Sequence, residues 1–141
     1  MKRAAEKDAS LREAALRAME NAYAPYSNFR VGAALRAKDG QVITGCNMEN
    51  SAFGLAICAE TLAVAYAVSQ GLTEFDEMAI ATEDTEPTPP CGACRQILWE
   101  FGGDLEIILC NLEREAGRYR LKDLLPLPFD QRLLGKLNSP S

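Results

Sequence analysis

The sequence contains no histidine among its 141 residues. This absence excludes serine–histidine nucleophilic catalysis, and it also excludes a metal site built on imidazole ligands. An enzyme with this sequence that works near neutral pH must therefore move protons with a carboxylate, a thiol, a lysine or a tyrosine.

Long apolar runs are also missing. No stretch approaches the roughly 20 apolar residues needed to cross a bilayer. The first ten residues, MKRAAEKDAS, are charged and lack the apolar segment of a secretory signal. We therefore expect a cytoplasmic protein that has no membrane partner.

A basic cluster is the third missing feature. The net charge is −5, and the lysines and arginines are dispersed along the chain. Proteins that grip a nucleic-acid backbone usually carry a basic patch or stripe. A nucleic-acid polymer is therefore not an expected partner, although a free nucleoside remains compatible with this charge.

Apolar periodicity predicts helices and strands in alternation. Helices are expected at about 10–24, 58–70 and 91–101. The second helix is apolar nearly all round, which predicts that it is buried. Strands are expected on both sides of an Asp39-Gly40 turn and at 77–82 and 105–110. A short strand or turn, a helical turn and an irregular tail from about residue 126 follow.

This order of elements favours a three-layer α/β/α domain with a mixed sheet of about five strands. The length suits one compact domain, so residues 1–141 are expected to form a single domain. The tail carries apolar residues, among them Leu127, Phe129 and Leu134. These apolar side chains are expected to pack against other apolar groups, and another subunit is one candidate partner.

Five cysteines are present, namely Cys46, Cys58, Cys91, Cys94 and Cys110. In a reducing cytosol, an odd number with one C-x-x-C pair indicates metal or redox chemistry before disulfides. Cys58 stands at the expected start of one helix, and Cys91 and Cys94 at that of another. Unpaired N–H groups at helix starts favour thiolates. Three thiolates brought together would repel one another without a cation, and zinc suits such ligands.

Three protein ligands with a fourth position open to water describe a catalytic zinc site. The run LAICAETLAV contains a single acid, Glu60, two residues after Cys58. A carboxylate is costly to bury in apolar surroundings unless something rewards it. Glu60 is therefore the candidate general acid and base, because it can take the proton of a water beside the metal.

Two other interpretations of the cysteines stay open at this point. A C-x-x-C pair also occurs in redox dithiols, although such a motif would leave Glu60 unexplained. A structural zinc site would need a fourth ligand, which Cys46 or Cys110 would supply. Both lie at expected strand ends, where small apolar side chains are common.

The motifs CAE and PCGACRQ, in this order, resemble the signature of zinc-dependent deaminases, (H/C)-x-E followed by P-C-x-x-C. The stretches YAPYSNFRVGAAL, TGCNMENSAFGL, PCGACRQILWEF and LLPLPFD also follow one another as in small homotetrameric cytidine deaminases. The resemblance implies a cytidine-deaminase-like sandwich, one zinc per subunit and a homotetramer. It also implies hydrolytic deamination of cytidine and 2′-deoxycytidine, with release of ammonia, in pyrimidine salvage.

The resemblance also assigns site residues. Cys58, Cys91 and Cys94 would bind zinc, and Glu60 would shuttle protons. The implied substrate contacts are Phe29 beside the pyrimidine, Asn47 and Glu49 on the ribose, the backbone of Ala59 on the base edge, and Ser51, Phe53 and Phe129 from neighbouring subunits. On pattern alone, Phe29 also suits core packing, Asn47 and Glu49 suit a polar turn, and Phe129 suits a tail covering its own core.

Two residues depart from the family pattern. Thr61 follows Glu60 where the family usually has arginine, and Phe53 stands where it commonly has tyrosine. The first departure removes a cation from a metal shell with net negative charge. A deaminase of another aminopyrimidine nucleoside, such as blasticidin S, is the alternative activity, because such relatives need no arginine after the Glu.

Overall fold

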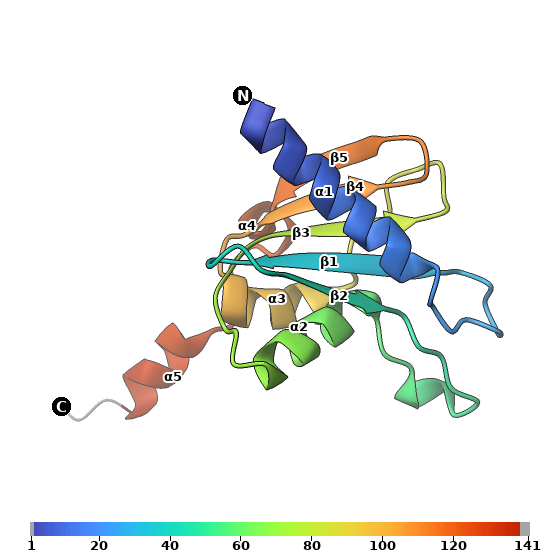
Figure 1. The fold of residues 1–141 in the computed structure, drawn as a ribbon. Coiled ribbons are helices and arrows are strands. Elements are labelled where there is room, and N and C mark those ends of the chain that lie inside the picture. Colours follow the sequence, from blue (N-terminus) through green and yellow to red (C-terminus); the bar gives the residue numbers. More distant parts are fainter. Residues whose placement is uncertain (1, 139–141) are drawn as a thin grey trace.

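The computed structural model describes residues 2–138. A five-stranded sheet in the order β2-β1-β3-β4-β5 has helices on both faces (Figure 1). The strands are β1 (Val31–Ala37), β2 (Val42–Cys46), β3 (Phe75–Thr82), β4 (Glu106–Cys110) and β5 (Glu115–Arg120). The helices are α1 (Lys2–Met19), η1 (Phe53–Leu55), α2 (Ala59–Ser69), α3 (Gly92–Gly102), α4 (Leu121–Leu124) and α5 (Gln131–Asn138). The expected three-layer architecture with a mixed sheet is confirmed.

Strand alternation sorts the apolar side chains into two cores. In β1, Ala33 and Leu35 pack with residues of α2 and α3, whereas Ala34 packs with residues of α1. In β4, Ile107 faces the first group and Ile108 the second. Because neighbouring side chains of a strand point to opposite faces, each strand contributes to both layers.

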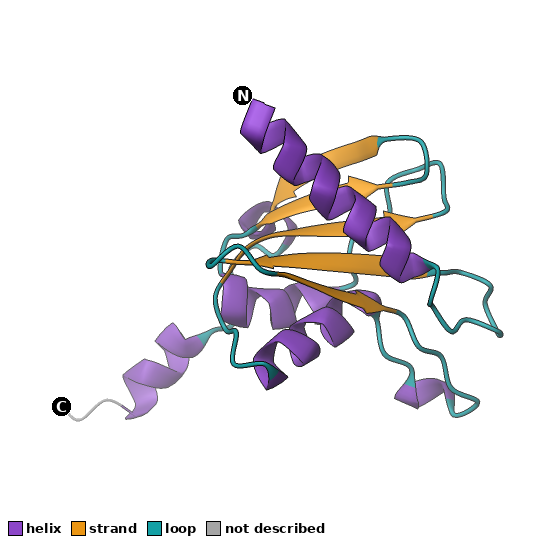
Figure 2. Ribbon diagram, in the orientation of Figure 1, coloured by secondary structure: helices purple, strands orange, loops and turns teal. Residues whose placement is uncertain are grey.

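The sheet is mixed because only β3 and β4 run parallel. The other neighbouring pairs are antiparallel. As a result, the loops that precede β1 and follow β2 and β3 leave the same edge of the sheet (Figure 2). Isolated bridges join two of these loops, pairing Tyr23 with Met48 and Met48 with Ile57. This edge brings together the starts of α2 and α3.

A glycine in β2 lets α2 approach the sheet. A Cβ built at Gly45 would lie 2.6 Å from both Ala59 O and Ala63 N. Real Cβ atoms do not come so close to a backbone, so a side chain here would push the helix away. Gly45 thereby sets the position of the helix that carries Glu60.

The structure corrects three expectations at the helices. α1 spans Lys2–Met19 instead of 10–24, so Ser10, the expected first residue, lies inside the helix. The residues before Ser10 are mostly strong helix formers, which extends the helix backwards. α2 was expected to be wholly buried, but only one of its faces is packed, and Ala65, Tyr66 and Val68 are exposed.

The third correction concerns the end of the chain. The tail expected to be irregular from about residue 126 is irregular only up to residue 130, and the helix α5 then extends away from the sheet (Figure 1). Leu133 and Leu134 lie in this helix and are exposed. None of the helices described for residues 2–138 combines the length and apolar character of a bilayer-spanning segment.

Replacing Gly45 by Ala is expected to lower the free energy of unfolding by about 1–3 kcal/mol, because the new methyl group overpacks against α2. Chemical unfolding followed by circular dichroism measures the change. Gly54→Ala is the matched control, since a Cβ there meets no atom within 4 Å. Equal stabilities of the two variants would contradict this account of the α2 contact.

Candidate metal centre and active site

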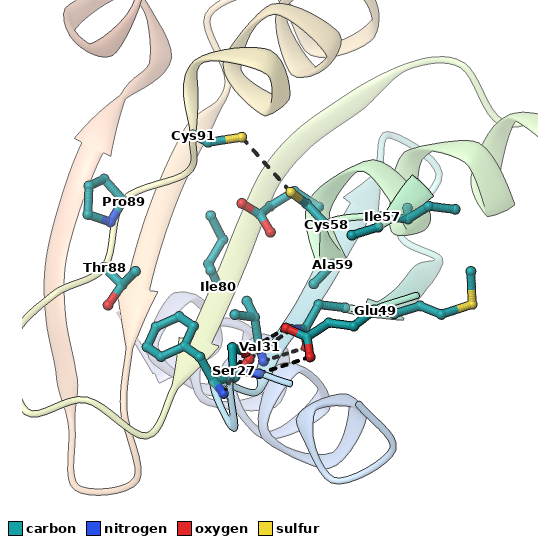
Figure 3. Close-up of a pocket in the computed structure, with 15 residues that line it drawn as sticks. Ser27, Val31, Glu49, Ile57, Cys58, Ala59, Ile80, Thr88, Pro89 and Cys91 are labelled. Atoms are coloured by element: carbon teal, nitrogen blue, oxygen red, sulfur yellow. Dashed lines mark hydrogen bonds between the residues drawn. The ribbon is translucent and has the colours of Figure 1, made fainter. Parts of the chain in front are cut away.

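Three cysteine sulfurs meet at the junction of two helix starts. Cys58 is the N-cap of α2, Cys91 is the N-cap of α3, and Cys94 lies in the first turn of α3. Their Sγ atoms all lie within 4.8 Å of one another, and those of Cys58 and Cys91 are 4.0 Å apart (Figure 3). Tetrahedral zinc with bonds of about 2.3 Å would hold its sulfurs roughly 3.8 Å apart. The donor set therefore fits one zinc ion.

The thiols differ in how easily they ionise. Burial raises the pKa of Cys91, but hydrogen bonds from the Cys94 N–H and from the neighbouring thiols outweigh it and lower this pKa below its ordinary value. Burial raises the pKa of Cys58 and that of Cys94, and the Glu60 carboxylate raises both further. The protein alone thus lowers the pKa of only one of the three thiols, so three thiolates together need a cation.

The other two cysteines lie elsewhere. Cys46 ends β2, and Cys110 ends β4, where it is buried with residues of α1. Among the residues that the structure describes, neither joins the three-cysteine group. The structural-zinc interpretation therefore lacks its fourth ligand here.

Glu60 is a buried carboxylate beside this cluster. It lies in the first turn of α2 and is only 5% exposed. Burial raises its pKa, which increases its ability to hold a proton. It shares a pocket of about 360 Å³ with Cys58 and Cys91.

The same pocket collects the expected substrate-contacting residues from three loops. Its lining includes Phe29 before β1, Asn47 and Glu49 after β2, and Ala59 at the start of α2. Thr88, from the loop after β3, lies across the pocket from Ala59 and Glu49 (Figure 3). The structure thus brings together Phe29 and Thr88, which lie 59 positions apart in the sequence.

The amide of Asn47 fastens the loop to the start of β1. Its Nδ2 donates to Phe29 O at 2.8 Å, and its Oδ1 accepts from Val31 N at 2.8 Å. These bonds leave one N–H of the amide and one lone pair of Oδ1 for another partner. Asn47 therefore has both a structural contact and spare capacity.

Glu49 is held by a loop that contains a residue we did not assign from the sequence. The Glu49 carboxylate accepts from Tyr26 N at 2.9 Å, Ser27 N at 3.2 Å and Ser27 Oγ at 2.5 Å. The Ser27 hydroxyl is the main cause that lowers the pKa of Glu49. Ser27 Oγ also accepts from Phe29 N at 3.0 Å, so Ser27 links Glu49 to Phe29. In the sequence, only the position of Ser27 within the motif YAPYSNF indicated that it belongs to the site.

The residues expected from neighbouring subunits separate into two places. Ser51 and Phe53 lie near Glu49 of the same chain, and Phe53 packs edge-on against Tyr26 with ring centroids 5.8 Å apart. Phe129 lies beside α3, where its carbonyl accepts from Gln96 Nε2 at 2.7 Å. Phe129 does not line the pocket of its own chain.

Thr61 contacts the sulfur of the buried Cys94, whereas Arg95 binds the backbone nearby. Thr61 Oγ1 lies 3.3 Å from Cys94 Sγ. Arg95 follows Cys94 in the sequence, but its guanidinium donates to two backbone carbonyls, Pro90 O at 2.8 Å and Leu124 O at 2.7 Å. Arg95 therefore braces the loop that leads into α3.

Comparison with known proteins places the chain in a family. The sequence profile of the cytidine and deoxycytidylate deaminase zinc-binding region matches residues 5–110. The chain belongs to this deaminase family.

Individual members of the deaminase family are similar over most of their length. A cytidine deaminase from Sporosarcina psychrophila is 44% identical over 116 residues, which cover 82% of this chain and 85% of the relative. The crystal structure of a cytidine deaminase from Burkholderia pseudomallei matches with a TM-score of 0.82 and 46% identity, covering 86% of this chain and 98% of that one. A blasticidin-S deaminase from Bacillus cereus is more distant, at 27% identity over 107 residues, covering 70% of this chain and 76% of the relative.

Membership confirms the deaminase resemblance that the CAE and PCGACRQ motifs carried. The matched region is the zinc-binding region of the family, and it contains the three clustered cysteines. Zinc is therefore the cofactor, and the redox interpretation of the C-x-x-C pair is set aside.

Replacing Cys58 or Cys94 by Ala is expected to reduce the zinc content of the purified protein from about one ion per chain to a small fraction, because two thiolates hold zinc poorly. Elemental analysis measures it. The matched controls are Cys46→Ser and Cys110→Ala, which are expected to keep their zinc. Loss of zinc in either control would indicate a fourth cysteine ligand and contradict an open site.

Proposed function

We propose that the protein catalyses the zinc-dependent hydrolytic deamination of cytidine and 2′-deoxycytidine to uridine and 2′-deoxyuridine, with release of ammonia, in pyrimidine salvage. The observation that carries the proposal is the buried carboxylate of Glu60 beside three clustered thiols, in a pocket whose other end presents a charged Glu49. The similar proteins named cytidine deaminases support the choice of substrate.

Cys58, Cys91 and Cys94 would hold the zinc ion, one per subunit. Zinc in such a site supplies Lewis acidity, which makes water a usable nucleophile near neutral pH. Both Cys58 and Cys91 stand at helix starts, where the partial positive charge of the helix favours an anion. At Cys91 the N–H of Cys94 also lowers the pKa of the thiol.

Glu60 would carry the protons. Its carboxylate takes a proton from the water that adds to C4 of the pyrimidine, and it delivers this proton to N3. Glu60 then moves the proton of the new C4 hydroxyl to the amino group, the C4–N4 bond breaks as the C4=O bond forms, and ammonia leaves. The apolar surroundings of Glu60 raise its pKa, which suits a group that must both accept and donate near neutral pH.

The remaining pocket residues would orient the nucleoside. Phe29 would lie beside the pyrimidine ring, and the backbone of Ala59 would contact the base edge. Asn47 and Glu49 would bind the ribose hydroxyls with the hydrogen-bonding capacity that their structural contacts leave free. The lowered pKa of Glu49 keeps it an anionic acceptor.

We propose further that the active protein is a cytoplasmic homotetramer in which neighbouring subunits supply Ser51, Phe53 and Phe129 to each site. Large apolar side chains are exposed on the single chain, which supports association: Phe53 is 76% exposed, Leu127 99% and Phe129 59%. The position of Phe129 outside its own pocket agrees with a role in a neighbour's site. A reducing compartment suits a site built from thiolates.

Replacing Glu60 by Gln is expected to lower kcat on cytidine by about 10²–10⁴-fold while zinc stays bound, because the amide cannot transfer the proton. The fall in cytidine absorbance and the release of ammonia measure the rate, and elemental analysis checks the metal. Substantial kcat in a zinc-loaded Glu60→Gln variant would remove Glu60 from the mechanism.

The native enzyme tests the choice of substrate. Adding a zinc chelator is expected to abolish its activity on cytidine. A higher rate on blasticidin S than on cytidine would favour the alternative deaminase activity, whose named relative is more distant in sequence.

Subunit complementation tests the shared site. Phe129→Ala subunits carry an intact Glu60, and Glu60→Gln subunits carry an intact Phe129. If Phe129 serves a neighbour's pocket, mixed tetramers of the two weakly active variants are expected to recover activity, because some sites receive both native residues.

Light scattering is expected to give a mass about four times the chain mass of 15.4 kDa. A monomeric mass, or mixtures no more active than their parents, would contradict the proposal.

A further inference from the structure

The three sulfurs of the metal site differ in their access to water. Cys58 and Cys91 are exposed, whereas Cys94 is 1% exposed. A thiolate at the surface is hydrated, but a buried one must obtain its hydrogen bonds from the protein. The identity of the protein donor to Cys94 therefore matters more than that of the donors to the other two sulfurs.

The structure offers one side-chain hydroxyl for this purpose. Thr61 Oγ1 lies 3.3 Å from Cys94 Sγ, within hydrogen-bonding distance for sulfur. Two thiol or hydroxyl groups can each donate, but a thiolate has no proton. Once Cys94 is ionised, the hydroxyl of Thr61 must be the donor and the sulfur the acceptor.

Arg95, the cationic residue next to Cys94 in the sequence, does not donate to the sulfur of Cys94. The Arg95 guanidinium donates to Pro90 O and Leu124 O, which holds the loop before α3. The Cys94 N–H points to the sulfur of Cys91 and lowers the pKa of that thiol. These contacts leave the Thr61 hydroxyl as the side-chain donor described at the buried sulfur.

We propose that Thr61 is a positioning residue that donates a hydrogen bond to the Cys94 thiolate and so stabilises the buried ligand of the zinc site. The inference rests on the three-cysteine site of the proposed function. The bond joins the first turn of α2 to that of α3, so it also ties the helix that carries Glu60 to the helix that carries Cys91 and Cys94. Thr61 acts through Cys94 and does not touch the substrate in this account.

A pair of conservative variants tests the hydrogen bond. Thr61→Val keeps the shape of the side chain and removes the hydroxyl, whereas Thr61→Ser keeps the hydroxyl. Zinc affinity is measured by competition with a chelator, on the full-length protein, with folding checked by circular dichroism. Thr61→Val is expected to bind zinc about 10–100-fold more weakly than the native protein, the usual effect of removing a partner of a metal ligand. Thr61→Ser is expected to retain near-native affinity.

Cobalt substitution supplies a second measurement that packing alone does not change. Loss of a donor raises the energy of the sulfur lone pairs, so the sulfur-to-cobalt charge-transfer band of Co²⁺-loaded Thr61→Val is expected at lower energy than in the native and Thr61→Ser proteins. Equal zinc affinities and equal bands for Val and Ser would overturn the role of Thr61 and leave the zinc site intact. Absence of tight zinc binding in the native protein would overturn both.

Discussion

Mutual repulsion among three sulfur anions is the constraint on which the site depends. The protein gathers the Sγ atoms of Cys58, Cys91 and Cys94 within 4.8 Å of one another, yet burial raises the pKa of all three thiols, and hydrogen bonds outweigh this only at Cys91. A divalent cation resolves this conflict, because it binds only the ionised sulfurs and neutralises most of their charge. The affinity for zinc therefore depends directly on how the starts of α2 and α3 are arranged.

The fold serves this site by fixing two helix starts at one edge of a sheet. Gly45 allows α2 to lie against β2, and the parallel pair β3 and β4 carries α3 as its crossover. Loops from the same edge add Glu49, which Ser27 holds in place. The clustered cysteines and Glu49 thus line one pocket that the same edge of the sheet supports, an arrangement that would help to orient a small ligand.

Much of this arrangement was predictable from local patterns. The alternation of strands and helices gave the architecture, and the spacing of Cys58, Glu60, Cys91 and Cys94 pointed to a catalytic metal. Contacts between distant segments were not predictable in this way. The Thr61–Cys94 contact joins residues 33 positions apart, and the Ser27–Glu49 bond joins residues 22 apart. The exposed face of α2 was also missed, because an apolar helix has the same pattern whether its own sheet or another subunit covers it.

X-ray absorption at the zinc edge tests the central claim most directly. The open three-sulfur site predicts three sulfur neighbours at about 2.3 Å and one lighter oxygen neighbour at about 2.0 Å from the metal of the native protein. Four sulfur neighbours, or the absence of stoichiometric zinc, would contradict the account.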